Sequence, residues 1–284
     1  TWEILAQSLI VDEYSLHIYN GAFGKKSYDV AHSLTEKAEA LNFDINEELP
    51  IEKISNYPFI NLCQNETSNG TAVSNQTLKK LRNKHPNSII SVDITSSLGG
   101  AFIDFSSADV WYGSVQKCLG LPSGLGIILI NERAIETVKE KQIQYHYNDL
   151  LNLVLNAEKW QTTHTPNILN IHALAFSQSK TSSIESINKE LIFRKNEIVT
   201  RLPQYTFVAS NTQVQSTTIF TIETKKSEQI ISEALKNNIV LGKGYGQWEK
   251  ATFRIANFPS IEIQSFEKLI TFLNSIKKAT LDIK

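Results

Sequence analysis

The chain has 284 residues, enough for one large domain or two of ordinary size, and its 41% hydrophobic and 20% charged residues are those of a globular protein. A formal net charge of -1 gives no electrostatic reason to bind nucleic acid or an anionic membrane surface, and no apolar run reaches membrane-spanning length, so we expect neither partner. Two cysteines, Cys63 and Cys118, cannot make a disulfide framework, and a cytoplasmic location is the expectation.

The start of the chain bears on completeness. The sequence begins with Thr1 and contains no methionine at all, although cores of this size usually use some. We therefore expect that residues preceding Thr1 are missing from this sequence.

Hydrophobic periodicity predicts strands and helices that alternate through the first half of the chain. Clusters of Gly, Ser, Asn and Pro between them mark the turns, including Gly21-Ala22-Phe23-Gly24. The predicted helices here are 2–10, 25–41 and 75–84, and the predicted strands are 15–20, 43–46, 59–63, 89–92, 108–115 and 125–130.

Two of these apolar runs end in polar residues that can carry chemistry. The run 89–92 ends in Asp93, and the run 108–115 is followed by Gln116 and Lys117. Chemistry in open α/β sheets collects where neighbouring strands end, so we expect an acid and an amine to face one crevice. Each residue alone has a plainer explanation, Asp93 as a strand-end cap and Lys117 as a surface lysine before a turn.

An aspartate and a lysine placed in this way suit pyridoxal phosphate. The lysine amine bonds covalently to the cofactor aldehyde, and the aspartate keeps the pyridine nitrogen protonated so that the ring withdraws electrons from the substrate. The glycines that follow, Gly120, Gly124 and Gly126, do not have dinucleotide-binding spacing, and a strand follows them where a helix is needed.

The second half of the chain predicts a long linking helix and a smaller unit of strands and helices. The segment 145–161 is irregular and aromatic. Arg254 lies inside an apolar strand, where an unpaired guanidinium is costly, so it requires an anionic partner. The predicted helices are 168–178, 184–202, 227–237, 266–276 and one that begins near 134, and the predicted strands are 217–222, 239–241 and 252–256.

The stretch VDITSSLGG…DVWYGSVQKCLGLPSGLG, within residues 92–126, resembles the cofactor signature of class V aminotransferases, a fold-type I family. The resemblance implies an α/β fold with a three-layer large domain around a mainly parallel sheet, here 1–180. A linking helix and a smaller α/β C-terminal domain would form 181–284. It also implies pyridoxal 5'-phosphate as cofactor, no metal, and an N-terminal segment before Thr1 that carries a substrate-binding arm and the phosphate-cradling turn.

The resemblance assigns roles to residues around the cofactor. Phe23 matches the ring that stacks on the cofactor, with ordinary core packing as the alternative. Thr67, in the turn Glu66-Thr67-Ser68-Asn69-Gly70, matches a threonine whose hydroxyl bonds the cofactor. Ser96 lies in the turn after Asp93, where it could reach the phosphate, and Gln116 is expected to touch the phosphate or the region of the 3-hydroxyl.

The resemblance also implies contacts that involve substrate and a second subunit. Thr165, with His164 beside it, matches a turn that crosses the interface of a homodimer and gives a hydroxyl to the partner's cofactor phosphate. The alternative is a helix cap, and both can hold. Arg254 matches the arginine that clamps the substrate carboxylate, with a structural ion pair between domains as the alternative.

The residue before the lysine separates branches of the family. Cysteine desulfurases usually have histidine there and need a reactive loop cysteine, whereas this chain has Gln116, and neither Cys63 nor Cys118 is placed like that cysteine. The resemblance therefore favours transamination between an amino acid and a 2-oxo acid. Phosphoserine aminotransferase of serine biosynthesis, which uses glutamate and 3-phosphohydroxypyruvate, is preferred. An alanine–glyoxylate or serine–pyruvate aminotransferase is the alternative, followed by a desulfurase or a non-catalytic cofactor-binding protein. Unassigned candidates for a substrate-phosphate contact are His146, Lys243 and Lys250.

Overall fold

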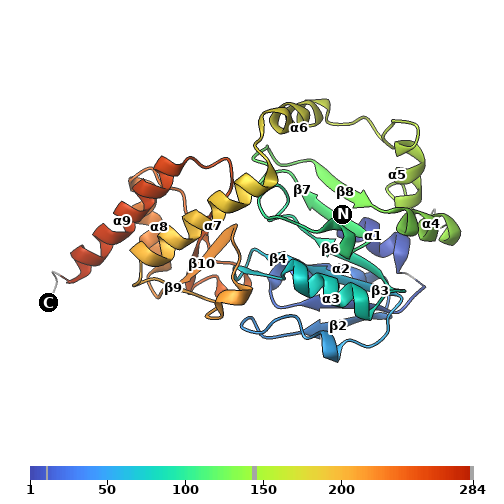
Figure 1. Ribbon diagram of the computed structural model, residues 1–284, viewed down its shortest axis with the longest axis horizontal. Coiled ribbons are helices and arrows are strands. Elements are labelled where there is room, and N and C mark those ends of the chain that lie inside the picture. The colour runs from blue at the N-terminus through green and yellow to red at the C-terminus, as the bar shows by residue number, and fades with distance from the viewer. Residues whose placement is uncertain (11, 143–145, 282–284) are drawn as a thin grey trace.

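The central element is a six-stranded sheet in the order β2-β1-β3-β6-β7-β8 (Figure 1). The computed structural model describes residues 1–10, 12–142 and 146–281. Neighbouring strands of this sheet are parallel except β8, which pairs antiparallel with β7 at one edge. The fold class predicted from the sequence is confirmed. The strands are β1 (Ser15–Tyr19), β2 (Ala38–Asn42), β3 (Phe59–Cys63), β6 (Ile89–Asp93), β7 (Val110–Ser114) and β8 (Gly126–Ile130).

Helices cover both faces of this sheet and make three layers. On one face, Leu78 and Leu81 of α3 pack in a core with strand residues such as Ile60 and Val92. On the other face, α1, α2, α4 and α5 pack against the alternate strand residues, such as Phe59. This follows the period of two along a strand, which sends successive side chains to opposite faces. The helices are α1 (Trp2–Leu9), α2 (Ala22–Leu34), α3 (Asn75–Lys84), α4 (Glu132–Lys141) and α5 (Leu150–Ala157).

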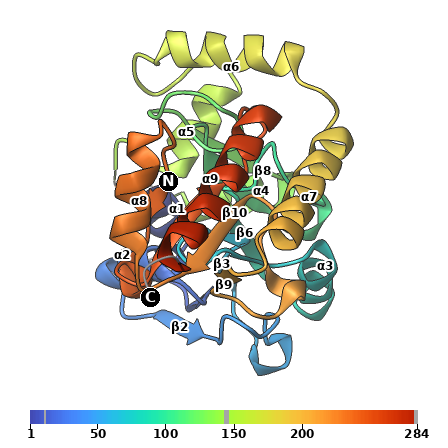
Figure 2. The same ribbon diagram turned by 90° about the vertical axis from the view of Figure 1, so that its left-hand side faces the viewer.

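The C-terminal part of the chain builds a second core around an antiparallel sheet in the order β11-β12-β10-β9. Figure 2 shows α7, α8 and α9 on the side of β10 that faces away from the large sheet. The helix α6 (Ile168–Lys180) precedes this part and lies apart at the top of both views. The other elements are α7 (Ile184–Arg201), β9 (Thr206–Phe207), β10 (Ile219–Glu223), α8 (Ser227–Lys236), β11 (Gly242–Lys243), β12 (Thr252–Ala256) and α9 (Ile263–Leu281).

The largest error of the sequence-based prediction lies between residues 25 and 46. The predicted helix 25–41 ends at Leu34, and 38–42 forms β2 rather than helix, while 43–46 is not a strand. The segment is rich in Glu, Lys and Ala, which favour helix. Its backbone instead pairs in parallel with β1, so tertiary pairing overrides local propensity here.

Other differences are smaller. The segment 145–161, expected to be irregular, contains α5, whose N-cap Asp149 accepts a hydrogen bond from the Asn152 amide at 2.7 Å. Residues 143–145 lie outside the described part of the chain. The strand predicted at 239–241 is found at 242–243 instead. Within the described residues, no helix is both long enough and apolar enough to cross a bilayer.

Candidate active site

A cavity of about 540 Å³ opens where β6 and β7 end at the carboxyl edge of the large sheet. It is lined by the end of β6, the turn after β7, the first residues of α1 and the turn after β3. A volume of this size lies within the range of about 300–1,000 Å³ that small-molecule sites occupy. Predicted residues that line it are Phe23, Thr67, Asp93, Ser96, Gln116 and Lys117.

Asp93 ends β6 with a carboxylate that is buried to 6% exposure. One carboxylate oxygen accepts the Thr95 amide at 2.8 Å, and the other accepts the Trp2 indole N–H at 3.0 Å. Among the described residues, no lysine or arginine pairs with it. Burial raises the pKa of Asp93, and the two donors offset part of that rise. A buried carboxylate without a cation is a ready partner for a protonated ring nitrogen.

Lys117 lies three residues beyond the end of β7, the strand that pairs Tyr112 with Asp93. Its half-buried side chain lines the same cavity as Asp93, as the strand-end argument predicted. Burial is the main cause that lowers the pKa of Lys117, and the positive charge of Arg254 lowers it further. A lowered pKa leaves more of the amine in the neutral form that acts as nucleophile or base.

The turn after β3 joins the other predicted polar residues. The Thr67 hydroxyl donates to the Ser96 hydroxyl at 3.0 Å, and Ser96 in turn donates to the Asn65 carbonyl at 2.8 Å. The Asn65 amide donates to Ser96 at 2.8 Å and to Thr218 at 2.9 Å. Ser96 therefore uses its hydroxyl within the protein, which leaves Thr67 as the freer hydroxyl acceptor at the cavity wall.

Phe23 lies in the first turn of α2 and lines the cavity. Its ring stacks on Tyr245 from the C-terminal part, with centroids 4.7 Å apart and planes 13° apart. A ring has two faces, so one face on Tyr245 leaves the other for a cofactor ring. The stacking of Phe23 on the cofactor remains a prediction.

Arg254 reaches this region from β12 of the C-terminal sheet. Its guanidinium donates to the Thr67 carbonyl at 3.2 Å and to the Lys243 carbonyl at 2.8 Å, and it lies 5.8 Å from the Tyr245 ring centroid. No ion pair to Arg254 is found within the described residues. The guanidinium thus adjoins the Thr67 turn and keeps capacity for an anion, as a carboxylate clamp requires.

Three predicted residues do not line this cavity within the chain: Arg254, which adjoins it through the Thr67 carbonyl, and two residues farther away. His164 and Thr165 are exposed in the segment before α6, where His164 contacts Thr163 at 3.0 Å and the Tyr147 ring. The cap of α6 is Asn167, not Thr165. Their predicted contact with the cofactor of a second subunit stays untested. The phosphate candidates His146, Lys243 and Lys250 are exposed as well.

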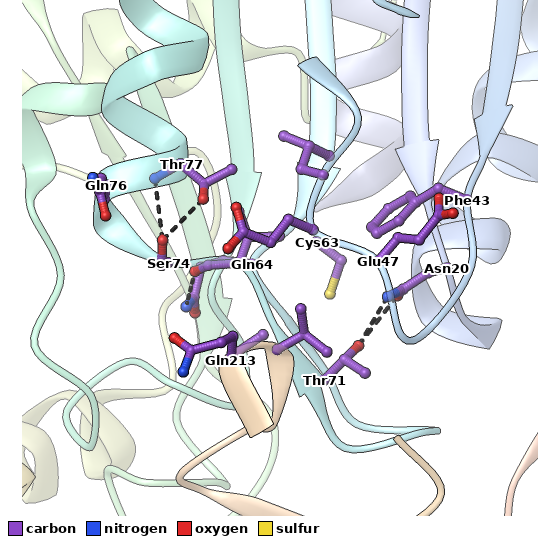
Figure 3. A pocket seen from close by; sticks show the side chains of 15 residues that line it. Asn20, Phe43, Glu47, Cys63, Gln64, Thr71, Ser74, Gln76, Thr77 and Gln213 are labelled. Atoms are coloured by element: carbon purple, nitrogen blue, oxygen red, sulfur yellow. Dashed lines mark hydrogen bonds between the residues drawn. The ribbon is translucent and has the colours of Figure 1, made fainter. Parts of the chain in front are cut away.

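A smaller cavity of about 150 Å³ shares Cys63 with the first one (Figure 3). Its polar groups bond one another: Asn20 donates to Thr71 at 3.0 Å, and Gln64 donates to the Val73 carbonyl at 2.9 Å. Burial raises the pKa of the Cys63 thiol well above its ordinary value and that of Cys118 to about 12. Neither cysteine is a ready thiolate, which disfavours desulfurase chemistry.

Sequence reasoning missed several residues that shape the site. Trp2 holds Asp93, Asn65 ties the Thr67 turn to the C-terminal part, and Tyr245 covers Phe23. Glu66 was read only as part of a turn, yet it is buried to 2% exposure with a full set of donors. A charged residue between a buried strand and a polar turn was the available signal for Glu66. The partners of the other three come from distant segments and leave no local pattern.

The residues present fit pyridoxal 5'-phosphate. Asp93 supplies an unpaired buried carboxylate for the ring nitrogen, Lys117 an amine with a lowered pKa, and Phe23 an aromatic wall. The N-terminus of α1 lines the same cavity and suits a phosphate through its free backbone amides. The fold and the residues of the cavity together fit the fold-type I class of pyridoxal-phosphate proteins.

Comparison with known proteins agrees with this fold class and identifies the family within it. The family model for Aminotransferase class-V matches residues 32–247, and the chain belongs to this family, whose cofactor is pyridoxal 5'-phosphate. It is 32% identical over 181 residues to phosphoserine aminotransferase of Rhodococcus opacus, a match that covers 61% of this chain and 47% of that protein. The chain therefore spans about half the length of the curated relatives it matches.

Solved structures show the same architecture. A phosphoserine aminotransferase from Cytophaga hutchinsonii superposes with a TM-score of 0.90 at 28% identity, over 96% of this chain and 79% of that one. An alanine–glyoxylate aminotransferase from Nostoc sp. superposes with a TM-score of 0.86 at 19% identity, over 97% of this chain and 78% of that one. The second likeness shows the fold alone.

Proposed function

We propose that this chain carries out pyridoxal-phosphate-dependent transamination between an amino acid and a 2-oxo acid. The observation that carries the proposal is the meeting of charged groups from three separate elements: two of them line the cavity, and the third adjoins its wall at the Thr67 turn. Asp93 ends β6, Lys117 follows β7, and Arg254 arrives from the C-terminal sheet at the Thr67 turn. An electron-withdrawing ring needs the first, a proton transfer the second, and an amino-acid carboxylate the third.

Each residue has a task that its surroundings support. Arg254 binds the substrate carboxylate and so orients the α-carbon. Lys117 removes the proton at the α-carbon with its neutral Nζ and returns it at the neighbouring position, since its lowered pKa leaves the amine free to do so. Asp93 holds the proton on the ring nitrogen, and Phe23 keeps water from one face. When bound, pyridoxal 5'-phosphate supplies the sink for the electron pair left at the α-carbon.

For substrates, we propose O-phosphoserine and 2-oxoglutarate, which the reverse reaction forms from glutamate and 3-phosphohydroxypyruvate in serine biosynthesis. The support is the naming of relatives: proteins called phosphoserine aminotransferase match the chain at 32% identity, and one such structure superposes at a TM-score of 0.90. The exposed candidates for the substrate phosphate are Lys243, beside Tyr245, and Lys250; His146 is the third. The second candidate is alanine–glyoxylate transamination, which the turn Glu66-Thr67-Ser68-Asn69-Gly70 also suits.

We further propose a homodimer in which Thr165 of one copy serves the cofactor of the other. Thr165 lies outside its own cavity, and the helix that follows it, α6, exposes large apolar side chains to solvent. Surfaces of this kind mark contacts between proteins. One symmetric contact with a second copy would cover the apolar side chains of α6 and bring Thr165 to the cavity of the partner. The exposed apolar residues of α6 are Ile168, Leu169, Ile171 and Phe176.

We propose a domain boundary between 1–180 and 181–284, because the two hydrophobic clusters on the faces of the large sheet lie within the first range and the third cluster lies within the second. A cytoplasmic location is proposed from the two free cysteines, because neither is in a disulfide.

The test is a visible spectrum of the full-length protein before and after addition of O-phosphoserine, and separately of alanine. Bleaching of the lysine-bound cofactor band with O-phosphoserine alone supports the proposed substrate. Bleaching with alanine alone keeps the chemistry and moves the enzyme to the alanine–glyoxylate branch. No band after pyridoxal 5'-phosphate is supplied contradicts the enzyme proposal.

A further inference from the structure

A buried glutamate lies beside the cofactor cavity with no task in the mechanism above. Glu66 sits on β4 (Asn65–Glu66), directly before Thr67, and is buried to 2% exposure. An ionised carboxylate in such a place is costly unless donors surround it. It also adjoins a site that must accept the anionic groups of cofactor and substrate, so its negative charge needs a reason.

The donors around Glu66 come from the first turn of α2. One carboxylate oxygen accepts the backbone amides of Gly24 at 2.9 Å and Phe23 at 3.1 Å. The other accepts the Ser68 amide at 3.0 Å and the Ser68 hydroxyl at 2.7 Å. The Ser68 hydroxyl in turn accepts the Ala22 amide at 2.9 Å. Glu66 and Ser68 together therefore satisfy three successive amides of α2.

Helix α2 cannot cap itself. The residue at its N-cap position is Gly21, which has no side chain to accept the free amides that every helix start leaves. Gly21 is also required by the glutamate, because a Cβ there would lie 2.3 Å from Cγ of Glu66. The cap is thus supplied from another strand, and its negative charge is balanced by the positive end of the helix dipole.

We propose that Glu66 is a positioning residue: by capping α2 from β4, it fixes the Phe23 ring against the cofactor cavity. Phe23 is at once the residue whose amide Glu66 holds and the residue whose ring lines the cavity. Glu66 also fixes the turn that carries Thr67, since Ser68 on the other side of Thr67 is held by the same carboxylate. Its negative charge also acts to raise the pKa of Arg254 and offsets part of the lowering by burial. The inference rests on the proposed function and deepens it.

The test compares Glu66→Gln with the wild type in the full-length protein, by titration of the apoprotein with pyridoxal 5'-phosphate. The substituted side chain presents an NH₂ group to backbone amides that need an acceptor, so the first turn of α2 loosens. Hydrogen bonds to a charged group are worth about 1.5–3 kcal/mol, and we expect the cofactor Kd to rise by about 10- to 100-fold. Hydrogen exchange of the amides of residues 22–24 should accelerate in the apoprotein as well.

Two further variants separate positioning from general stability. Asp149→Ala removes the buried side chain that caps another helix, α5, and should lower the melting temperature without changing the cofactor Kd. In a Phe23→Leu background, Glu66→Gln should add less than about 3-fold, because the ring that it positions is gone. Glu66→Asp, which keeps the charge but shortens the reach, replaces Glu66→Gln if the latter does not fold.

The outcomes are distinct. If Glu66→Gln binds the cofactor as tightly as the wild type, or keeps its full effect without Phe23, the inference is overturned while the proposed function stands. If the wild type itself fails to bind pyridoxal 5'-phosphate, the proposed function and the inference fall together. A raised Kd that depends on Phe23, with faster exchange at residues 22–24, establishes the positioning role.

Discussion

Two buried aspartates lie at opposite ends of the strands in the large sheet. One is surrounded by neutral donors and the other by arginines. Asp93 is at the carboxyl edge, where β6 ends, and its partners are two neutral N–H donors. Asp109 is at the amino edge, just before β7, and bonds two arginines, Arg82 and Arg133. The exposed fractions are similar, 6% and 4%, so burial does not distinguish them.

The pKa values of the two carboxyls move in different directions. Burial raises the pKa of Asp93, and its donors do not reverse the rise. Burial also acts to raise the pKa of Asp109, but hydrogen bonds led by the one from Arg133, together with the charge of Arg82, lower it overall. Asp109 finds its cationic partners within the protein, and its bonds to Arg82 and Arg133 stabilise the amino end of the sheet. Asp93 has no lysine or arginine partner among the described residues, and we expect a cationic ligand group to pair with it.

The comparison shows that a buried carboxylate on a cavity wall points to a ligand when the protein gives it neither a cation nor a helix start to cap. Among the described residues, Glu66 and Asp149 also lack a cation, but each accepts the amides at the start of a helix. The same test applies to Arg254, which has carbonyl partners and an aromatic neighbour but no ion pair within the described residues. Both groups border the region where we place the cofactor and the substrate. We therefore interpret Asp93 and Arg254, which have no ion pair among the described residues, as groups that bind ligands. We interpret Asp109, which has two ion pairs, as a structural residue.

The largest effect on activity is expected for Asp93→Asn, which tests whether Asp93 serves the cofactor rather than the fold. We expect kcat/KM to fall by about 10²–10³-fold, since the ring nitrogen loses its counter-charge. We expect the free energy of unfolding of the apoprotein at neutral pH to stay or rise, because a buried unpaired charge is removed. Steady-state kinetics and urea unfolding measure the two quantities. A variant that is fully active would remove Asp93 from the site.

The matching change, Asp109→Asn, should do the reverse. It leaves two arginines without their shared carboxylate, and we expect a loss of about 3 kcal/mol in the free energy of unfolding. The cofactor Kd of the folded fraction should stay within about 2-fold of the wild type, since Asp109 lies at the far edge of the sheet. An unchanged stability would show that the cluster around Asp109 is not structural.

A pair of substitutions at Arg254 tests the second unbalanced group. Arg254→Lys keeps the charge and loses the two-pronged geometry, whereas Arg254→Gln loses both. Both should raise KM for the amino acid by about 10- to 100-fold. The positive charge of Arg254 lowers the pKa of Lys117, which must be neutral to act as a base, so the Gln variant should move the acidic limb of the pH–rate profile to higher pH and the Lys variant should not. Equal profiles for the two variants would contradict this coupling.

The last prediction concerns His17, a buried base on β1 away from the cavity, and it affects stability alone. Burial lowers its pKa from 6.5 to about 4. Between these values the unfolded chain binds a proton here and the folded chain does not, so stability falls as the pH falls, by up to about 3 kcal/mol. Unfolding of His17→Gln should show a shallower loss between pH 6.5 and 4.5 than the wild type. If the free energy of unfolding of the two proteins changes with pH in parallel, groups other than His17 cause the loss of stability in acid.

The sequence predicted the site better than it predicted its supports. Asp93 and Lys117 were predicted to meet because strand ends converge at one edge of an α/β sheet, a rule that needs no knowledge of distant contacts. Tyr245 and Trp2 could not be predicted in this way, because they reach the site from remote segments. The error at 38–42 has the same origin, since pairing with β1 outweighs the helical propensity of that segment.

The most direct test of the account is reduction of the cofactor-loaded full-length protein with borohydride, followed by peptide mapping. We expect one cofactor equivalent on Lys117, none in Lys117→Ala, and full labelling of Lys195→Ala. Lys195 is the matched control, because burial lowers its pKa to about 8 although it lies outside the cavity. An adduct that persists in Lys117→Ala, or that maps to Lys195, would contradict the central claim that Lys117 carries the cofactor.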